Sequence, residues 1–335
     1  MSGGLLAAAE SLVIGLRQTG AAPAVLAALL AGVVAARPGE TAAQVALAQC
    51  RWEAGDRPGA IAAWRAAVAL CPKDPMAAAL LGIGLVRAGA LSHGPELAEG
   101  CALLEGVAAR APAILDARLW LGIGLVELRR TAAGLAVLEA LLPQLPEDQR
   151  LHLSRGHALL TLGRLGEGWA SHAWRWRQRR AIAVRAPADP LARPDPGTWA
   201  GRTVLLYAEQ GHGDTLQCLR YVTMAVASGA RVVLEVQPAL VRLARMMPEV
   251  AAGVTAVLAQ GEVVPAHDIA VPMFHLPWAF GTELGSIPAA VPYLRPDPGE
   301  VAGWRGWLGG ASGWCGRAIR ARGRRTRMRW TGGGR

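Results

Sequence analysis

The stretch QVALAQCRWEAGDRPGAIAAWRAAVALCP, residues 44–72, decides how the first half of the chain folds. It reads as two helices joined at Gly55 and ended by Pro72. Small residues Ala60 and Ala67 flank the large Trp64 at helical spacing, so this helix can lie close against a neighbour. A single helical hairpin cannot bury its apolar face alone, which predicts that similar hairpins stack beside it.

The same pattern recurs in register along the first half of the chain. The second unit carries about six extra residues near positions 91–96, by comparison with a 34-residue period. The landmarks are Pro38 at the end of a degenerate first unit, Leu81, Gly82, Gly89 and Pro112 in the second full unit, Leu121, Gly122, Leu138, Leu141 and Pro146 in the third, and Gly156, Leu159, Gly163, Gly168 and His172 in the fourth. Over roughly residues 8–182 the pattern resembles the tetratricopeptide repeat family, which implies an α-solenoid with a protein or peptide partner.

Composition and charge narrow the class of protein. The net charge is +10, but residues 311–335 carry eight arginines and no acid, so the rest of the chain is nearly neutral and nucleic acid is not the expected partner. Five scattered cysteines without a CxxC pair indicate reduced thiols and a cytoplasmic location. The uncharged run Ala24–Ala36 is rich in alanine and indicates a buried helix without stable membrane insertion. The histidines make no metal set, and no cofactor is expected.

The pattern changes after the repeats. Residues 183–200 are rich in proline and read as a linker between domains. Beyond them, short apolar strands at Arg202–Ala208, Arg231–Val236, Val254–Ala259 and Asp268–Val271 alternate with helices over Asp214–Ser228 and from Pro238 to Met247. Residues 201–308 are therefore expected to form a parallel sheet covered on both faces, and the fold class is α plus α/β.

The segment LLYAEQGHGDTLQCLRY, residues 205–221, holds the candidate site. A strand ends at Ala208, a loop with Gly211 and Gly213 follows, and a helix opens at Asp214 or Thr215. Ligands of open α/β sheets bind at the carboxyl ends of strands, and a helix N-terminus attracts anions. The alternative is a tight glycine turn with Asp214 as an ordinary helix cap, and it stays open.

This segment, together with SGARVVLEVQPALVRL and DIAVPMFHLPWAFGTELGSIPAAVPYL, resembles glycosyltransferase family 9, the heptosyltransferase family, over about residues 200–308. The resemblance implies one Rossmann-like half of a GT-B glycosyltransferase, with a nucleotide-sugar donor and a sugar or glycan acceptor as substrates. It implies that Asp214 is the general base of an inverting transfer. The implied acceptor-binding residues are Glu209, Gln210, Gly211, His212, Gly213 and Arg220, where His212 departs from the small or aliphatic residue of the family.

A GT-B enzyme needs a second lobe for the nucleotide sugar, and residues 309–335 are expected to be a basic, disordered tail. When Ser312–Arg322 is written in GC-rich codons and read one base earlier, the translation is an apolar strand followed by a Trp-Ala-Gly-Asn-Pro turn. A shift of the reading frame near residues 309–311 is therefore a hypothesis. Resequencing of the gene tests it. The sequence-based expectation is a tetratricopeptide-repeat glycosyltransferase-like protein that is inactive in this form. The alternative function is a non-catalytic scaffold that binds a protein through the repeats.

Overall fold

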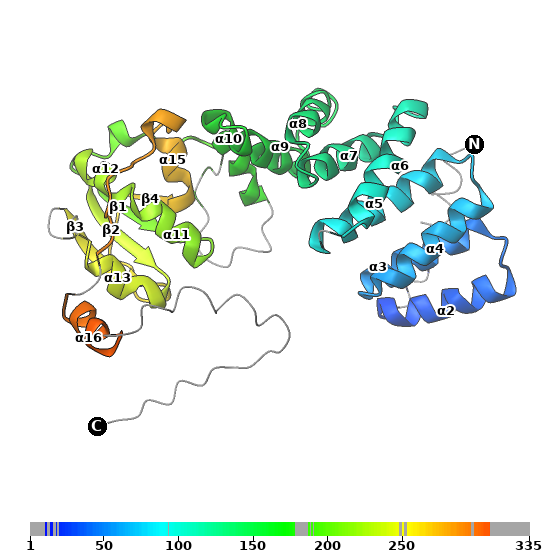
Figure 1. Ribbon diagram of the computed structural model, residues 1–335, viewed down its shortest axis with the longest axis horizontal. Helices are drawn as coiled ribbons and strands as arrows, with labels where there is room; N and C mark the ends of the chain where they lie inside the picture. Colours follow the sequence, from blue (N-terminus) through cyan, green and yellow to red (C-terminus); the bar gives the residue numbers. More distant parts are fainter. Residues whose placement is uncertain are drawn as a thin grey trace.

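The computed structural model describes residues 20–92, 94–177, 191–247, 253–295 and 298–308, with positions 11, 14, 15, 18, 187, 189 and 250. The tail proposed to be frame-shifted, residues 309–335, and most of the first half of the proposed linker lie outside the described residues. Within them, a row of helices leads into a small sheet flanked by helices (Figure 1).

The row of helices consists of antiparallel pairs that follow the predicted register. Helix α2 (Pro23–Ala36) ends before Pro38 and packs on α3. Four pairs follow: α3 (Thr41–Glu53) with α4 (Arg57–Leu70), α5 (Pro75–Ser92) with α6 (Glu96–Arg110), α7 (Leu115–Glu127) with α8 (Thr131–Glu139), and α9 (Gln149–Thr161) with α10 (Leu165–His172). Helix α5 has 18 residues where α3, α7 and α9 have 13, so the extra residues of the second unit lengthen this helix.

Small residues let the two helices of a pair approach closely. In the pair α7–α8, a Cβ atom added at Gly134 would lie 2.8 Å from the carbonyl oxygen of Gly122. In the pair α5–α6, a Cβ atom at Gly100 would lie 2.8 Å from the carbonyl oxygen of Gly82. Because real Cβ atoms do not approach backbone oxygen this closely, each crossing requires glycine. The glycines of the repeat pattern are therefore packing residues.

Helix α5 is also the one helix among the described residues that is long and apolar enough to cross a bilayer. Half of that stretch is buried inside the array of helices. A core helix in a stack of hairpins has the same composition, so this feature is weak evidence for a membrane span.

The second part of the described chain contains a parallel sheet of four strands. The strands are β1 (Thr203–Tyr207), β2 (Arg231–Val236), β3 (Val254–Ala259) and β4 (Ile269–Pro272), in the spatial order β3-β2-β1-β4. Between them lie α11 (His212–Leu219), α12 (Val222–Ala227), η3 (Pro238–Leu240) and α13 (Val241–Arg245), and η4 (Met273–His275), α15 (Leu276–Ala279), η5 (Leu284–Ser286) and α16 (Pro298–Leu308) follow β4. The four predicted strands are present, and each of their ends lies within one residue of the prediction.

The helix predicted over Asp214–Ser228 is two helices, so this prediction was wrong in its bounds. It begins at His212 and breaks at Arg220 and Tyr221. The break lets Tyr221 enter the core at 4% exposure, while the Arg220 side chain donates a hydrogen bond to the carbonyl of Pro288.

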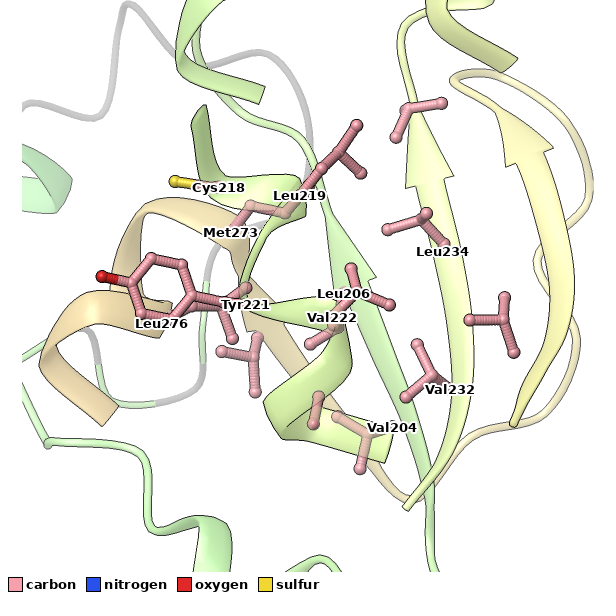
Figure 2. Close-up of a cluster of buried hydrophobic side chains, with 14 of the residues drawn as sticks. Val204, Leu206, Cys218, Leu219, Tyr221, Val222, Val232, Leu234, Met273 and Leu276 are labelled. Carbon is pink, nitrogen blue, oxygen red and sulfur yellow. The ribbon is translucent and has the colours of Figure 1, made fainter. Parts of the chain in front are cut away.

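One face of the sheet is covered by helices. Figure 2 shows Val204 and Leu206 of β1 with Val232 and Leu234 of β2, packed against side chains of α11, α12 and the segment after β4. Trp199, at the end of the predicted linker, belongs to this core and is 1% exposed. The sheet core therefore begins before the first strand.

The opposite face packs against the end of the helix row. Leu205, Tyr207 and Val233 form a second cluster with Trp176 of η1 (Ala173–Arg177), the 3₁₀ turn that follows α10. Trp176 lies within the range assigned from sequence to the repeats. The helical array and the sheet thus share a core.

Candidate functional site

The strand order places a topological switch point between β1 and β4, the position where α/β sheets bind ligands. Strands β2 and β3 lie on one side of β1, and β4 lies on its other side. Ligands of such sheets bind at the carboxyl ends of the two strands where the order reverses, here β1 and β4. The segments at that point are residues 208–214 after β1 and Met273–His275 after β4. The predicted site residues 209–214 therefore lie at the topological switch point.

Asp214 lies in the first turn of α11, and one of its oxygens already has a partner. Helix α11 begins at His212 with Gly211 as the N-cap, and Asp214 Oδ2 accepts a hydrogen bond of 3.0 Å from the Gly211 amide. The expectation that the helix opens at Asp214 or Thr215 was wrong, because the carboxylate caps the turn from its third position. His212 and Gly213 are exposed, and Asp214 is half-buried.

Glu209 forms an ion pair with an arginine of the helical array. Its side chain is 1% exposed, and Arg175, whose side chain is 6% exposed, donates to Glu209 Oε1 through Nη2. Burial raises the pKa of Glu209, while Arg175 and the backbone amide of Phe274 oppose that shift. Glu209 is therefore not an ordinary surface residue. Its Oε1 is already bonded to Arg175 of the helical array and is not free to bind an acceptor.

Aromatic rings surround this ion pair. The Arg175 guanidinium lies 5.4 Å from the ring centre of Trp176 and 5.9 Å from that of Phe274. Arg175 Nη1 also donates to the His172 carbonyl at 3.2 Å. Trp169 of α10 meets Phe274 edge to face with ring centres 5.3 Å apart. The end of the array thus packs its own side chains against Glu209 and Phe274, in the segments that follow β1 and β4.

Two histidines in this cluster are held in the neutral form. Burial first, and the positive charge of Arg175 second, lower the pKa of His275 to about 2 and that of His172 to about 3. Both ring nitrogens of His275 are buried without a hydrogen-bond partner among the described residues. His275 packs between Trp176 and Trp278, with ring centres 6.4 and 5.7 Å away.

Two glutamines fix the loop that follows β1. Gln237, after β2, donates from Nε2 to the carbonyl of Gln210 at 2.8 Å. Gln260, after β3, donates from Nε2 to the carbonyl of Ala208 at 2.7 Å. These bonds hold the backbone on both sides of Glu209, so the ends of β2 and β3 fix the loop that follows β1.

Arg220 lies at the other end of α11 and is tied to the segment after β4. Its Nη1 donates to the Pro288 carbonyl at 3.1 Å, and its guanidinium lies 4.8 Å from the ring centre of Tyr293. Of the seven predicted site residues, six lie in the switch-point loop and the first turn of α11, while Arg220 is engaged elsewhere.

Arg175 was not predicted from the sequence, and His275 was given no role. Arg175 was hidden in an arginine-rich run, and a charged residue there is ordinarily solvated. Its neighbours Trp174 and Trp176 were the available signal, because arginine stacks on aromatic rings. Within the described ranges, no group of three His, Cys, Asp or Glu is arranged to hold a metal ion.

The helical array has a groove of its own. It has a volume of about 360 Å³ and lies between α5 and the start of α7. Met76, Leu80 and Ile83 line one side, Ile114 and Leu115 line the other, and Leu145 contributes from the α8–α9 connection. The lining is mostly apolar and only half-buried, so an extended peptide can contact it.

Comparisons with known proteins give structural neighbours only. No protein-family model matches the chain, and no curated protein matches it significantly. Solved structures that resemble it include a MamA AMB-1 structure, with 19% identity and a TM-score of 0.41 over 50% of this chain and 92% of that one. A MamA RS-1 double mutant has 16% identity and a TM-score of 0.43 over 54% and 97% of the two chains. TTC0263, a thermophilic TPR protein of Thermus thermophilus, has 20% identity and a TM-score of 0.41 over 53% and 91%. These TPR-type neighbours extend over about half of the chain, and at these TM-scores they carry no functional argument.

Proposed function

We propose that this protein is an interaction scaffold whose helical repeats bind a partner protein. The observation that carries the proposal is a contrast between two regions. The α5–α7 groove is open and apolar, whereas Glu209 at the switch point of the sheet is buried and paired with Arg175, which lies among aromatic rings. Of these two regions, the groove is therefore the better place for a partner.

The shared core fits this role. Trp176 packs into the sheet, and Arg175 pairs with Glu209 beside the switch point. The array is therefore held in a fixed orientation on the α/β unit, as a scaffold that displays a partner requires.

A randomised peptide selection tests the proposal. Acetylated and amidated nonapeptides are selected on the full chain, and their affinity is measured for the wild type, Ile83→Asp and Val263→Asp. Ile83 lines the groove, while Val263 is 92% exposed in the β3–β4 connection, so both changes add one charge, and an unchanged circular dichroism melt shows that each variant is folded. Selected peptides are expected to lose affinity for Ile83→Asp alone. Equal affinity for both variants, or no enriched peptide, would contradict the proposal.

A second candidate function is the acceptor-side half of a family 9-like sugar transferase. What favours it is the position of the Gly211–Asp214 segment at the switch point, with His212 and Gly213 exposed. Asp214 would then take the proton of an acceptor hydroxyl as that hydroxyl attacks the anomeric carbon. Transfer also requires a lobe for the nucleotide sugar, and the sheet among the described residues is a single four-stranded one.

Sugar-nucleotide turnover tests the second candidate. The chain is incubated with a panel of nucleotide sugars and glycan acceptors, and released nucleoside diphosphate is measured for the wild type and Asp214→Asn. Turnover that Asp214→Asn abolishes would support transfer, and no release above the blank would rule it out for that panel. We also propose a cytoplasmic location, because Cys50, Cys71, Cys101 and Cys218 are free thiols. Cell fractionation tests it, and recovery in a membrane or secreted fraction would contradict it.

A further inference from the structure

The groove between α5 and α7 continues into a charged position. Met76, Leu80, Ile83 and Arg87 follow one another at spacings of four, three and four residues, so they share one face of α5. The first three line the groove, and Arg87 is the next residue along the stripe. An apolar floor thus ends at a cation.

Arg87 is held between two tryptophans. Its guanidinium lies 4.4 Å from the ring centre of Trp52 on α3 and 5.8 Å from that of Trp120 on α7. The two rings fix the guanidinium on the side of α5 that faces these neighbours. The first helices of three successive pairs therefore build this position together.

No acid neutralises Arg87 within the part of the chain that the structure describes. Burial lowers the pKa of Arg87. The positive charges of Arg150 and Arg57 lower it as well. The acid on the groove wall, Asp116, already pairs with Arg150 at 3.0 Å. A half-buried cation among other cations gains most from an anionic partner.

We infer that the groove and Arg87 together recognise an extended segment of a partner protein in which an acidic side chain follows an apolar one by two residues. This inference rests on the proposed scaffold function and names its partner. The rise from Ile83 to Arg87 is four helical residues, about 6 Å. Two residues of extended chain span about 6.6 Å, so the apolar side chain sits over the groove and the carboxylate meets Arg87.

The charge distribution favours an acidic side chain over a chain-terminal carboxylate. Arg57 lies 5.9 Å from the ring centre of Trp52, so positive charge continues past Arg87 along α3 and α4. A partner segment that runs on with further acidic residues meets this second arginine. A partner chain whose terminal carboxylate bound Arg87 would end there and would not reach Arg57.

The peptide selection described above tests the inference when it is repeated on Arg87→Gln and on Arg37→Gln as the matched control. Arg37 is 75% exposed at the end of α2, so its loss removes the same charge outside the groove. Amidated peptides selected on the wild type are expected to carry Asp or Glu two residues after an apolar residue. Their affinity is expected to fall about tenfold or more for Arg87→Gln, as for the loss of a charged hydrogen bond, and to be unchanged for Arg37→Gln.

Three results would overturn the inference. The first is enrichment without acidic residues, and the second is equal affinity for Arg87→Gln in a chain whose circular dichroism melt is unchanged. Both leave the scaffold function standing, because peptides still bind. The third is a preference for peptides with a free carboxyl terminus over amidated ones, which would assign Arg87 to chain ends. If no peptide is enriched on the wild type, the scaffold function and this inference fail together.

Discussion

Replacing Arg175 by Met tests how firmly the array is joined to the sheet. The variant keeps an unbranched side chain beside Trp176 and Phe274 but leaves Glu209, which is 1% exposed, without its cation. Removing one member of a buried ion pair costs about 3–5 kcal/mol, because the remaining charge is buried and uncompensated. We expect a loss of that size in the free energy of unfolding.

The assay is urea unfolding followed by tryptophan fluorescence, with Arg175→Met, Glu209→Gln and the double variant in one cycle. Because the double variant has no buried charge left at this position, it is expected to be more stable than Arg175→Met alone. A loss below about 1 kcal/mol for Arg175→Met, or costs that simply add in the double variant, would be inconsistent with a buried, mutually dependent pair.

The pH dependence gives an independent reading of the same change. Without Arg175, the folded-state pKa of Glu209 rises further above its unfolded value of about 4.3. A raised folded pKa contributes stability below the unfolded pKa, and that contribution is lost as pH rises through the folded pKa. The deficit of Arg175→Met is therefore expected to be larger at pH 8 than at pH 5. A deficit that does not change with pH would contradict this.

Three further predictions concern packing, histidine titration and the candidate base. Gly134→Ala is expected to lower stability by about 2 kcal/mol or more in thermal unfolding, because the added Cβ meets a backbone oxygen. Gly106→Ala is the control: its Cβ would have one neighbouring atom, at 3.8 Å, and it is expected to raise stability by about 0.5–1 kcal/mol. Equal effects of the two changes would contradict the argument that the helix crossing requires glycine. Burial lowers the pKa of His275 from 6.5 to about 2 in the folded chain. Its neutral ring therefore stabilises the fold fully above pH 6.5, and this contribution is lost as pH falls from 6.5 toward 2. Between pH 7.5 and 5, His275 alone is expected to lower the free energy of unfolding by about 2 kcal/mol. In urea unfolding at several pH values, His275→Phe is expected to lose this part of the dependence of stability on pH. An unchanged dependence would refute the prediction. Asp214→Asn keeps an oxygen that can accept from the Gly211 amide and is expected to cost about 0.3–1 kcal/mol, the effect of a charge at the N-terminus of α11. A loss well above about 1 kcal/mol in urea unfolding would contradict this.

The repeats could be predicted from the sequence because local rules fix them. Gly82 and Gly122 occupy the same place in the first helices of successive pairs, and both are buried where that register places them. The four strands could also be predicted from the sequence, since short apolar runs between turns are typical of buried parallel strands. Both features depend on neighbours in sequence.

The candidate site depends on contacts between distant residues, and the sequence does not reveal those. Arg175 and Glu209 are 34 positions apart, and no local pattern pairs them. Arg220 likewise donates its hydrogen bond to Pro288, which is 68 residues later in the chain. The sequence thus located the loop of residues 209–214 but not the side chains that fill the space beside it.

Hydrogen–deuterium exchange on the full chain, with and without an amidated peptide selected on it, provides the decisive test that partners dock on the array. We expect slower amide exchange in residues 76–87 of α5 and 114–120 of α7, with residues 209–220 unchanged. Protection that appeared at residues 209–220 instead, with none in α5 or α7, would contradict docking on the array and return the function to the switch point of the sheet.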